Sequence, residues 1–267
     1  MRAFRTGALL TAALALAASP AVAQQKSQFE QYQKMVGEDS PAELFVLVGA
    51  DLWRKKQGPK NASLERCDLG KGPGVVKGAY AALPRYFADA NQVMDAESRI
   101  FYCMETLQGR SRKEALKRPF GNADKPSEME YLDAFVASQS DGIRMAPGMS
   151  HPQEKSAYEL GKALFFTRMG LYDFSCASCH GEEGKRIRMS DLPVLSEPGP
   201  ARAAMSTWPA YRVSNSQMKT MQWRVNNCYR QMRTPQPVWG SEVVNSMIMY
   251  LTVNAKGAVY AGPGTKR

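Results

Sequence analysis

Apolar residues recur at helical spacing in two segments of the second half of the chain. In residues 156–170 they fall on one face of a helix, and the same is true of residues 241–257. The first stripe consists of Leu160, Ala163, Leu164 and Phe165, and the second of Val244, Met247, Ile248 and Leu251. Gly257 follows the second stripe, which is typical of a residue just beyond a helix end. The pattern predicts two core-facing helices, the second of which closes the fold.

A similar pair of segments occurs in the first half of the chain. Residues 49–53 (GADLW) parallel residues 161–165 (GKALF), and residues 119–136 resemble residues 237–251. In the second alignment the matched residues are Pro119 with Pro237, Tyr131 with Tyr250 and Leu132 with Leu251. Because the pattern occurs only twice, it predicts two similar domains in tandem and not a solenoid.

The boundary between these domains is predicted in the segment from Gly142 to Pro152, which is rich in Gly, Pro and Ser. We expect a first domain over residues 24–146 and a second over residues 147–267. His151 lies at the boundary and is predicted to be a linker residue. The C-terminal AGPGTKR is predicted to be mobile, because small polar chain ends without apolar anchors usually are.

The first 23 residues have the features of an export signal. Arg2 and Arg5 precede an uncharged apolar stretch that ends in Ala-Val-Ala. This stretch is short for a membrane span, and no later segment approaches the ~20 apolar residues that a span requires. We therefore expect a cleavable signal peptide over residues 1–23 and a mature protein in the bacterial periplasm, where disulfides persist.

The chain is basic, with a formal net charge of +10 at pH 7. Positive charge favours association with anions. The basic residues form no dense run, and nucleic acid is not expected in the periplasm, so small oxyanions or an acidic partner protein fit better. A solvated surface is the other interpretation that charge alone leaves open.

One short motif carries specific chemistry, since residues 176–180 read CASCH, the C-x-x-C-H pattern of c-type haem attachment. Two thiols add to the vinyl groups of one porphyrin, and the adjacent imidazole reaches the iron. A zinc knuckle would need a second pair of ligands, and His151 is the only other histidine. A redox C-x-x-C is disfavoured by the histidine that follows directly. The motif predicts one covalently attached haem c, held by Cys176 and Cys179, with His180 as an iron ligand.

The two apolar segments that flank this motif agree with a class I cytochrome c fold, which they resemble. In such domains the first and last helices cross. The resemblance implies that Gly161 and Phe165 on the first helix meet a residue such as Tyr250 on the last.

In the first half the corresponding motif is eroded to C-D-L-G-K at residues 67–71. A glycine and a lysine stand where the second cysteine and the histidine would be, so no pair of iron ligands remains. Cys103 occupies a place loosely equivalent to that of Cys228 in the second half. In an oxidising compartment Cys67 and Cys103 can therefore pair. Such a link closes a loop of about 37 residues and is worth on the order of 3–4 kcal/mol.

The remaining cysteine, Cys228, lies in the polar and Arg-rich segment 222–233, which is predicted to be helical. Arg224 precedes it by four residues, so both side chains point the same way on a helix. Positive neighbours favour the thiolate, the form that binds iron or attacks sulfur. A class I cytochrome also needs a sixth iron ligand from this part of the chain, and methionine is the usual one. The methionines in the right interval are Met205, Met218, Met221 and Met232. Chemistry alone leaves both ligand types open, and the basic surroundings favour Cys228.

At this point the pattern resembles the SoxA family, the larger subunits of the SoxAX cytochrome of bacterial thiosulfate oxidation. The resemblance covers nearly the whole mature chain, and its most specific parts are C-x-x-C-H and W-R-x-x-x-C at residues 223–228. It implies that Cys228 is the distal haem ligand and the active-site residue, as a thiolate or persulfide. It further implies that Arg224 holds the anionic substrate and that His180 is the proximal ligand. The eroded first motif departs from two-haem members and resembles single-haem members in which a disulfide replaces the first haem.

The resemblance also implies an activity and partners. The enzyme would be an L-cysteine S-thiosulfotransferase that joins thiosulfate to a cysteine of a SoxYZ carrier protein and passes electrons through haem c to a SoxX subunit. The main alternative is a non-enzymatic periplasmic electron carrier with one haem and methionine as the axial ligand. A haem peroxidase of two cytochrome domains is disfavoured, because that architecture uses two haems and the chain has a single C-x-x-C-H.

Overall fold

The computed structural model describes residues 40–122, 124–187 and 190–266. The expected signal peptide over residues 1–23 lies outside the described residues. Within them, none of the helices is both long enough and apolar enough to cross a membrane.

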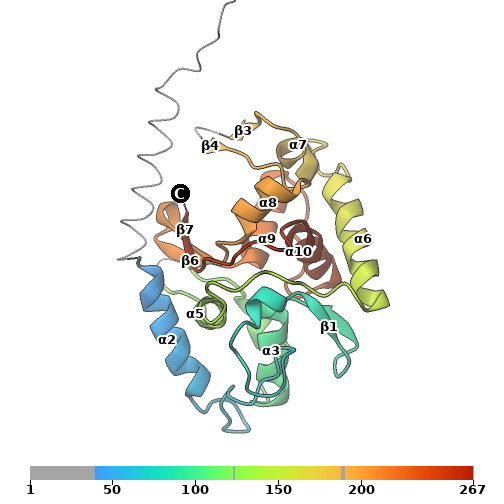
Figure 1. The fold of residues 1–267 in the computed structure, drawn as a ribbon. Helices are drawn as coiled ribbons and strands as arrows, with labels where there is room; N and C mark the ends of the chain where they lie inside the picture. Colours follow the sequence, from blue (N-terminus) through green and yellow to red (C-terminus); the bar gives the residue numbers. More distant parts are fainter. Residues whose placement is uncertain (1–39, 123, 188–189, 267) are drawn as a thin grey trace, which may run out of the picture. The chain divides into compact units, whose positions relative to one another are not determined.

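Helices make up most of the regular structure, so the mainly α fold class is confirmed (Figure 1). The helices of the first half are α2 (Ala42–Arg54), η1 (Tyr80–Ala82), α3 (Ala96–Thr106), α4 (Arg112–Lys117) and α5 (Glu128–Ser138). Those of the second half are α6 (Pro152–Phe166), α7 (Cys176–His180), α8 (Pro198–Met205), η2 (Val213–Asn215), α9 (Met221–Gln231) and α10 (Glu242–Asn254).

The strands are short and form three small sheets. Two are hairpins: β1 (Arg85–Phe87) with β2 (Gln92–Met94), and β3 (Arg186–Ile187) with β4 (Ser190–Asp191). The third has the order β6-β5-β7, from β5 (Ala210–Arg212), β6 (Gln217–Lys219) and β7 (Gly264–Lys266). In this sheet β5 pairs with β6 antiparallel and with β7 parallel.

Helices α6 and α10 cross at Gly161, and the crossing has room for a glycine only. A Cβ atom at this position would lie 1.9 Å from the carbonyl oxygen of Ser246 and 2.9 Å from the Cβ atom of Tyr250. Phe165, one turn further along α6, packs against Tyr250 with ring centroids 5.1 Å apart. The expected meeting of Gly161 and Phe165 with Tyr250 is confirmed.

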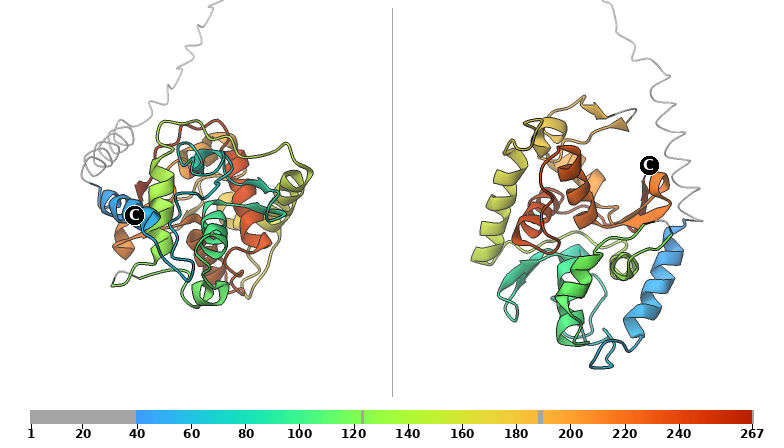
Figure 2. Two further views of the ribbon diagram at one scale, coloured as in Figure 1. Left: turned by 90° about the horizontal axis from the view of Figure 1, so that it is seen from below. Right: turned by 180° about the vertical axis from the view of Figure 1, so that it is seen from behind.

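Helices α2 and α5 repeat this crossing in the first half. A Cβ atom at Gly49 would lie 2.0 Å from the carbonyl oxygen of Tyr131 and 2.9 Å from the Cβ atom of Phe135. The ring of Trp53 packs against that of Phe135 at 5.8 Å. The repeat is therefore present as a pair of crossed helices, seen from two further directions in Figure 2.

The alignment of the repeat that the sequence suggested is wrong by one helical turn. Gly49 faces Tyr131 and Phe135 as Gly161 faces Ser246 and Tyr250. The structural counterpart of Tyr250 is thus Phe135, whereas the sequence comparison paired Tyr250 with Tyr131. The shared Tyr-Leu dipeptide misled the alignment because apolar residues recur every three to four positions along a helix, so a shift of one turn matches almost as well.

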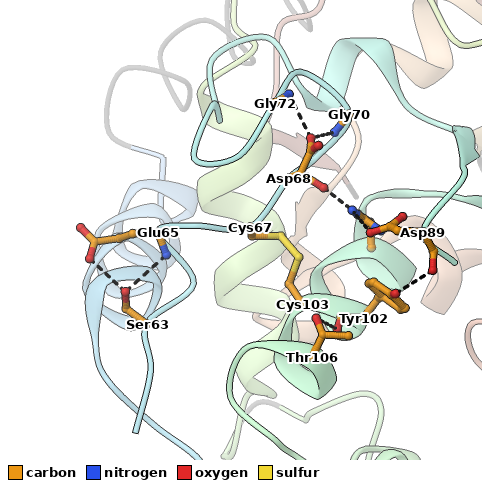
Figure 3. The surroundings of a disulfide bond; sticks show 11 residues. Ser63, Glu65, Cys67, Asp68, Gly70, Gly72, Asp89, Tyr102, Cys103 and Thr106 are labelled. Carbon is orange, nitrogen blue, oxygen red and sulfur yellow. Dashed lines mark hydrogen bonds and ion pairs between the residues drawn. A yellow bond between two sulfur atoms is a disulfide. The ribbon is translucent and has the colours of Figure 1, made fainter. Parts of the chain in front are cut away.

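The first half contains the predicted disulfide. Cys67 and Cys103 are bonded, with their Cα atoms 5.6 Å apart, and both are buried (Figure 3). The chain after Cys67 makes a tight loop in which the carboxylate of Asp68 accepts hydrogen bonds from the backbone N–H groups of Gly70 (2.7 Å) and Gly72 (3.0 Å). Both glycines have positive φ angles. The residues that replace the second cysteine and the histidine of a haem motif therefore form a closed turn beside the disulfide.

Two features near the expected domain boundary and the C-terminus have more structure than the sequence suggests. His151 caps the start of α6, where its Nδ1 accepts a hydrogen bond from the backbone N–H of Gln153, and its ring stacks on Tyr86 at 3.8 Å. The prediction of a mobile tail is wrong over residues 264–266. They form β7, which pairs with β5. The pairing overrides the polar composition because β5 offers an edge to which the last residues can bond.

The two halves also share buried polar contacts. Lys219 on β6 forms a buried ion pair with Glu130 on α5, at 3.0 Å. The Nζ of Lys219 donates in addition to the carbonyl oxygen of Gly121 and to Oε1 of Gln217, and Gln217 Nε2 donates to Glu130. Every donor of the ammonium group is satisfied, which is the condition for burying a charge. This pair fixes β6, and hence the start of α9, against the first half.

Candidate functional site

The C-x-x-C-H motif forms helix α7, a short helix with a well-defined start. Ser175 caps it, because its hydroxyl accepts from the backbone N–H of Ser178 at 3.1 Å. On this helix Cys176 and Cys179 are three residues apart and lie on the same side. Both are free thiols, and both are half-buried. The arrangement presents two thiols and the following imidazole of His180 together, as attachment of a single porphyrin requires.

The ring of His180 is oriented by a hydrogen bond of 2.8 Å between its Nδ1 and the carbonyl oxygen of Pro193. A carbonyl can only accept, so Nδ1 carries the proton and Nε2 keeps its lone pair. Burial lowers the pKa of His180, and the positive charge of Arg224 lowers it further, which favours the neutral ring. Iron-binding histidines have this tautomer and this kind of backbone partner. The residues present therefore fit a haem c whose iron His180 would bind.

Two further side chains, Cys176 on α7 and Tyr229 on α9, have the buried surroundings expected beside a bound haem. Burial, together with the nearby Cys228, raises the pKa of the Cys176 thiol to about 12. Tyr229 on α9 is buried, and its hydroxyl has no hydrogen-bond partner among the described residues. An orphaned buried hydroxyl is costly unless a bound group satisfies it. The unpartnered hydroxyl of Tyr229 therefore fits a site that a bound group completes.

Helix α9 places Arg224 and Cys228 as the sequence predicts. Thr220 caps the helix, since its hydroxyl accepts from the backbone N–H of Trp223 at 3.2 Å. One face, with Val225 and Tyr229, is buried in the core, whereas Arg224 and Cys228 lie together on the half-buried face. Cys228 is a free thiol. Cys228 lies close enough to Cys176, and Arg224 close enough to His180, to shift the pKa values of Cys176 and His180, so this face of α9 and helix α7 belong to one site.

The structure adds two cations to the site that the sequence analysis missed. Arg212 on β5 and Lys266 on β7 are direct partners across the parallel pair. The guanidinium of Arg212 lies over the ring of Trp223, 5.8 Å from its centroid, next to Arg224 in the chain. Burial, together with the positive charges of Arg224 and Arg212, lowers the pKa of Lys266 to about 8. The three cations are thus close enough to repel one another.

Among the described residues, no carboxylate forms an ion pair with this cluster. Within residues 40–122, 124–187 and 190–266, the ion pairs do not include Arg212, Arg224 or Lys266. Like charges placed opposite each other in a sheet are unfavourable. An anion bound between them would remove the repulsion, so the geometry is suited to a small oxyanion beside Cys228. No sequence signal marked Lys266, because β7 brings it from the end of the chain.

The methionines that could serve as a sixth ligand lie in the hydrophobic core. All four, Met205, Met218, Met221 and Met232, are buried. Met218 packs with Phe45 and Ala134 in a cluster on the side of α2, whereas the other three belong to the main cluster around α10. Buried methionines commonly fill cores in this way. Cys228 lies on the half-buried face of α9 instead, as a ligand to a bound group should.

Comparison with protein-family models gives one match: residues 48–145 fit the model described as "SoxA/TsdA, cytochrome c domain". These residues include the Cys67–Cys103 disulfide and end before the C-x-x-C-H motif.

Among curated proteins, an L-cysteine S-thiosulfotransferase subunit SoxA from Hydrogenophilus thermoluteolus is 48% identical over 89% of this chain and 87% of its own. A protein of the same name from Hydrogenobacter thermophilus is 34% identical over 91% of this chain and 93% of its own. Among solved structures, a chain in the crystal structure of SoxXA from P. pantotrophus superposes with a TM-score of 0.72, at 24% identity, over 89% of this chain and 84% of that one.

Proposed function

The chain belongs to the SoxA family, and on that basis we propose that it is the haem-containing L-cysteine S-thiosulfotransferase subunit of a periplasmic thiosulfate-oxidising system. Its partners would be a SoxX-like haem subunit and a SoxYZ-like carrier protein whose cysteine receives the thiosulfate. Residues 24–146 would form a haemless cytochrome c-like domain, and residues 147–267 the domain that carries one haem c.

In this proposal Cys176 and Cys179 would hold haem c covalently, and His180 and Cys228 would be the residues that bind its iron. When bound, haem c supplies a one-electron acceptor. Because the reaction releases two electrons, a second acceptor is required, and the haem of a SoxX-like subunit would provide it.

The chemistry of the protein residues centres on the sulfur of Cys228. A bond forms between this sulfur and the outer sulfur of thiosulfate, and two electrons leave the pair. The thiolate of the carrier cysteine then attacks the same outer sulfur. The bond to Cys228 breaks, the Cys228 thiolate is regenerated, and the carrier keeps a cysteine S-thiosulfonate. Arg224, with Arg212 and Lys266, holds the sulfonate oxygens through charge-assisted hydrogen bonds.

The observation that carries this proposal is the half-buried face of α9, on which Cys228 is near enough to Cys176, and Arg224 near enough to His180, to shift their pKa values. The test is to combine the holoprotein with SoxX, SoxYZ, thiosulfate and an electron acceptor. We expect a thiosulfate adduct on the carrier cysteine by mass spectrometry and a thiolate-type low-spin haem signal in paramagnetic resonance. A methionine-type signal without an adduct would instead support the electron carrier.

Substrate binding should depend on pH through Lys266. Its pKa of about 8 lies below the ordinary value for lysine, so its charge is lost as the pH rises past 8. We expect the KM for thiosulfate to rise between about pH 7.5 and pH 9, whereas Lys266→Arg should flatten this rise, since arginine stays charged. Lys266→Gln should have the high KM at every pH. Lys256→Gln, an exposed lysine beyond α10, is the matched control and should behave like the wild type. An unchanged pH profile in Lys266→Arg would remove Lys266 from the site.

A further inference from the structure

The start of α9 is held by carboxyl groups from the first half of the chain. The backbone N–H of Gln222 donates to Oε1 of Glu97 at 3.0 Å. The side-chain amide of Gln222 donates to both carboxylate oxygens of Asp95, at 2.8 and 2.9 Å. All three side chains are at least 96% buried. The first turn of the helix that carries Arg224 and Cys228 is therefore attached to α3, an element of the haemless half.

Gln222 is the point at which three helices are joined. Asp95 caps α3, since its side chain accepts from the backbone N–H of Ser98, and its own backbone N–H donates to Oδ1 of Asn245 on α10. The remaining polar atom of the Gln222 amide, Oε1, accepts from the backbone N–H of Gly240, just before α10. The amide is therefore fully used, which fixes both its position and its orientation.

Glu97 accepts a hydrogen bond from the backbone N–H of Gln222, which has no acceptor within α9. The first N–H groups of a helix have no acceptor within the helix, and a buried one left unpaired is costly. Thr220 accepts from Trp223, and Glu97 accepts from Gln222, so these two N–H groups of the first turn are paired. Burial raises the pKa of Glu97 well above its ordinary value, and Asp133 and Asp95 add to the shift. The other oxygen, Oε2, accepts from the indole Nε1 of Trp239 at 3.5 Å, so a neutral amide of the same shape can keep the contact with Gln222 through its carbonyl oxygen.

We propose that Glu97, through the backbone of Gln222, is a positioning residue that sets the direction of α9 and thereby places Cys228 and Arg224 in the site. This inference rests on the proposed role of Cys228. It assigns to the haemless half a part in the reaction, namely as the support of the catalytic helix.

The position of the Cys228 sulfur is sensitive to a small tilt of α9 at its start. Cys228 follows Gln222 by six residues, or about 9 Å along the helix axis. A tilt of α9 by about 10° at its start would therefore move the Cys228 sulfur by about 1.5 Å, and misplacement of a reacting group by about 1 Å can cost on the order of 100-fold in rate. Arg212 and Lys266 lie on the sheet and would stay in place, so substrate binding should suffer less than turnover.

The test uses the holoprotein with Glu97→Ala, Glu97→Asp and Glu97→Gln. Glu97→Ala removes the acceptor of the Gln222 N–H. Glu97→Asp moves this acceptor away by the length of one methylene group, and Glu97→Gln keeps it. We expect Ala and Asp to show a second low-spin haem signal beside the wild-type one. Their kcat should fall about 10- to 100-fold, with a change in the KM for thiosulfate of less than about 3-fold. Gln should restore the single signal and the wild-type kcat. If Glu97→Ala does not fold, the haem signal and the kcat of Glu97→Asp decide the outcome.

Glu105→Ala is the matched control, because Glu105 lies on the same helix and contacts Arg112 instead of α9. It should leave the haem signal and kcat unchanged. A single wild-type signal with wild-type kcat in Glu97→Asp, accompanied only by a lower melting temperature, would make Glu97 merely structural and overturn the inference. The wild-type spectrum is recorded first. If it shows no sulfur ligation from Cys228, the proposed function is refuted. The effect of the Glu97 variants on the haem signal is a separate measurement and can still be scored.

Discussion

Replacing Cys228 by alanine should lower the rate of thiosulfate transfer to the carrier by at least about a thousandfold, equivalent to about 4 kcal/mol of transition-state stabilisation. Without this sulfur no bond to the outer sulfur of thiosulfate can form at the site, and removal of a nucleophile usually leaves only the contribution of binding. Single-turnover transfer, measured by mass spectrometry of the carrier, checks the result. The haem signal should change at the same time, because the proposed sulfur ligand of the iron is lost.

Two variants separate the role of the sulfur from that of helix α9. Cys228→Met keeps a sulfur ligand that cannot be a nucleophile, so it should give a methionine-type haem signal and remain inactive. Gln231→Ala, at an exposed position near the end of the same helix, should keep wild-type activity and the wild-type signal. Transfer by Cys228→Ala within about tenfold of the wild-type rate would remove Cys228 from the mechanism.

The parts of the site that the sequence predicted are those set by local spacing. The C-x-x-C-H motif defines its own geometry within one helical turn, and Arg224 and Cys228 share a face because they are four residues apart on α9. The disulfide could be inferred by counting, because Cys67 and Cys103 are the only cysteines outside the second half. None of these inferences required knowledge of how distant segments meet.

The parts that could not be predicted arise where distant segments meet. Lys266 reaches the site only because β7 pairs with β5, which brings the last residues of the chain beside Arg212. Pro193 supplies a carbonyl to His180, and a backbone atom leaves no mark in the choice of residue. Glu97 has the appearance of an ordinary acid near the start of a helix, and its role depends on the distant Gln222.

The alignment of the internal repeat was missed for a different reason. The comparison of the two segments of sequence matched Tyr131 with Tyr250, whereas the geometry of the helix crossing matches Phe135 with Tyr250. At such a crossing the decisive property is the absence of a side chain at the glycine, and the partner helix contributes a backbone carbonyl there. The identity of the residue opposite is therefore weakly constrained, so the two glycines align correctly and their partners do not.

Replacing Lys219 by methionine should lower the free energy of unfolding by about 3–5 kcal/mol, the range typical of breaking a buried ion pair from one side. The substitution removes the ammonium group and leaves Glu130 buried without its cation, while Gln217 and the carbonyl of Gly121 also lose a donor. Urea unfolding of the holoprotein measures the loss. Because β6 leads directly into α9, a part of the same molecules should also show an altered haem signal before global unfolding.

The energetic origin of this loss can be separated from simple loss of packing. In Lys219→Met/Glu130→Met both charges are gone. The double variant should lose less unfolding free energy than the two single variants lose together, because no uncompensated charge remains. Lys185→Met is the matched control: its partner Glu182 is 76% exposed, so the change should stay within about 0.5 kcal/mol. If Lys219→Met were as mild as Lys185→Met, the ion pair between β6 and α5 would not hold the two halves together, and the attachment of α9 would depend instead on contacts such as those of Glu97 and Asp95 with Gln222.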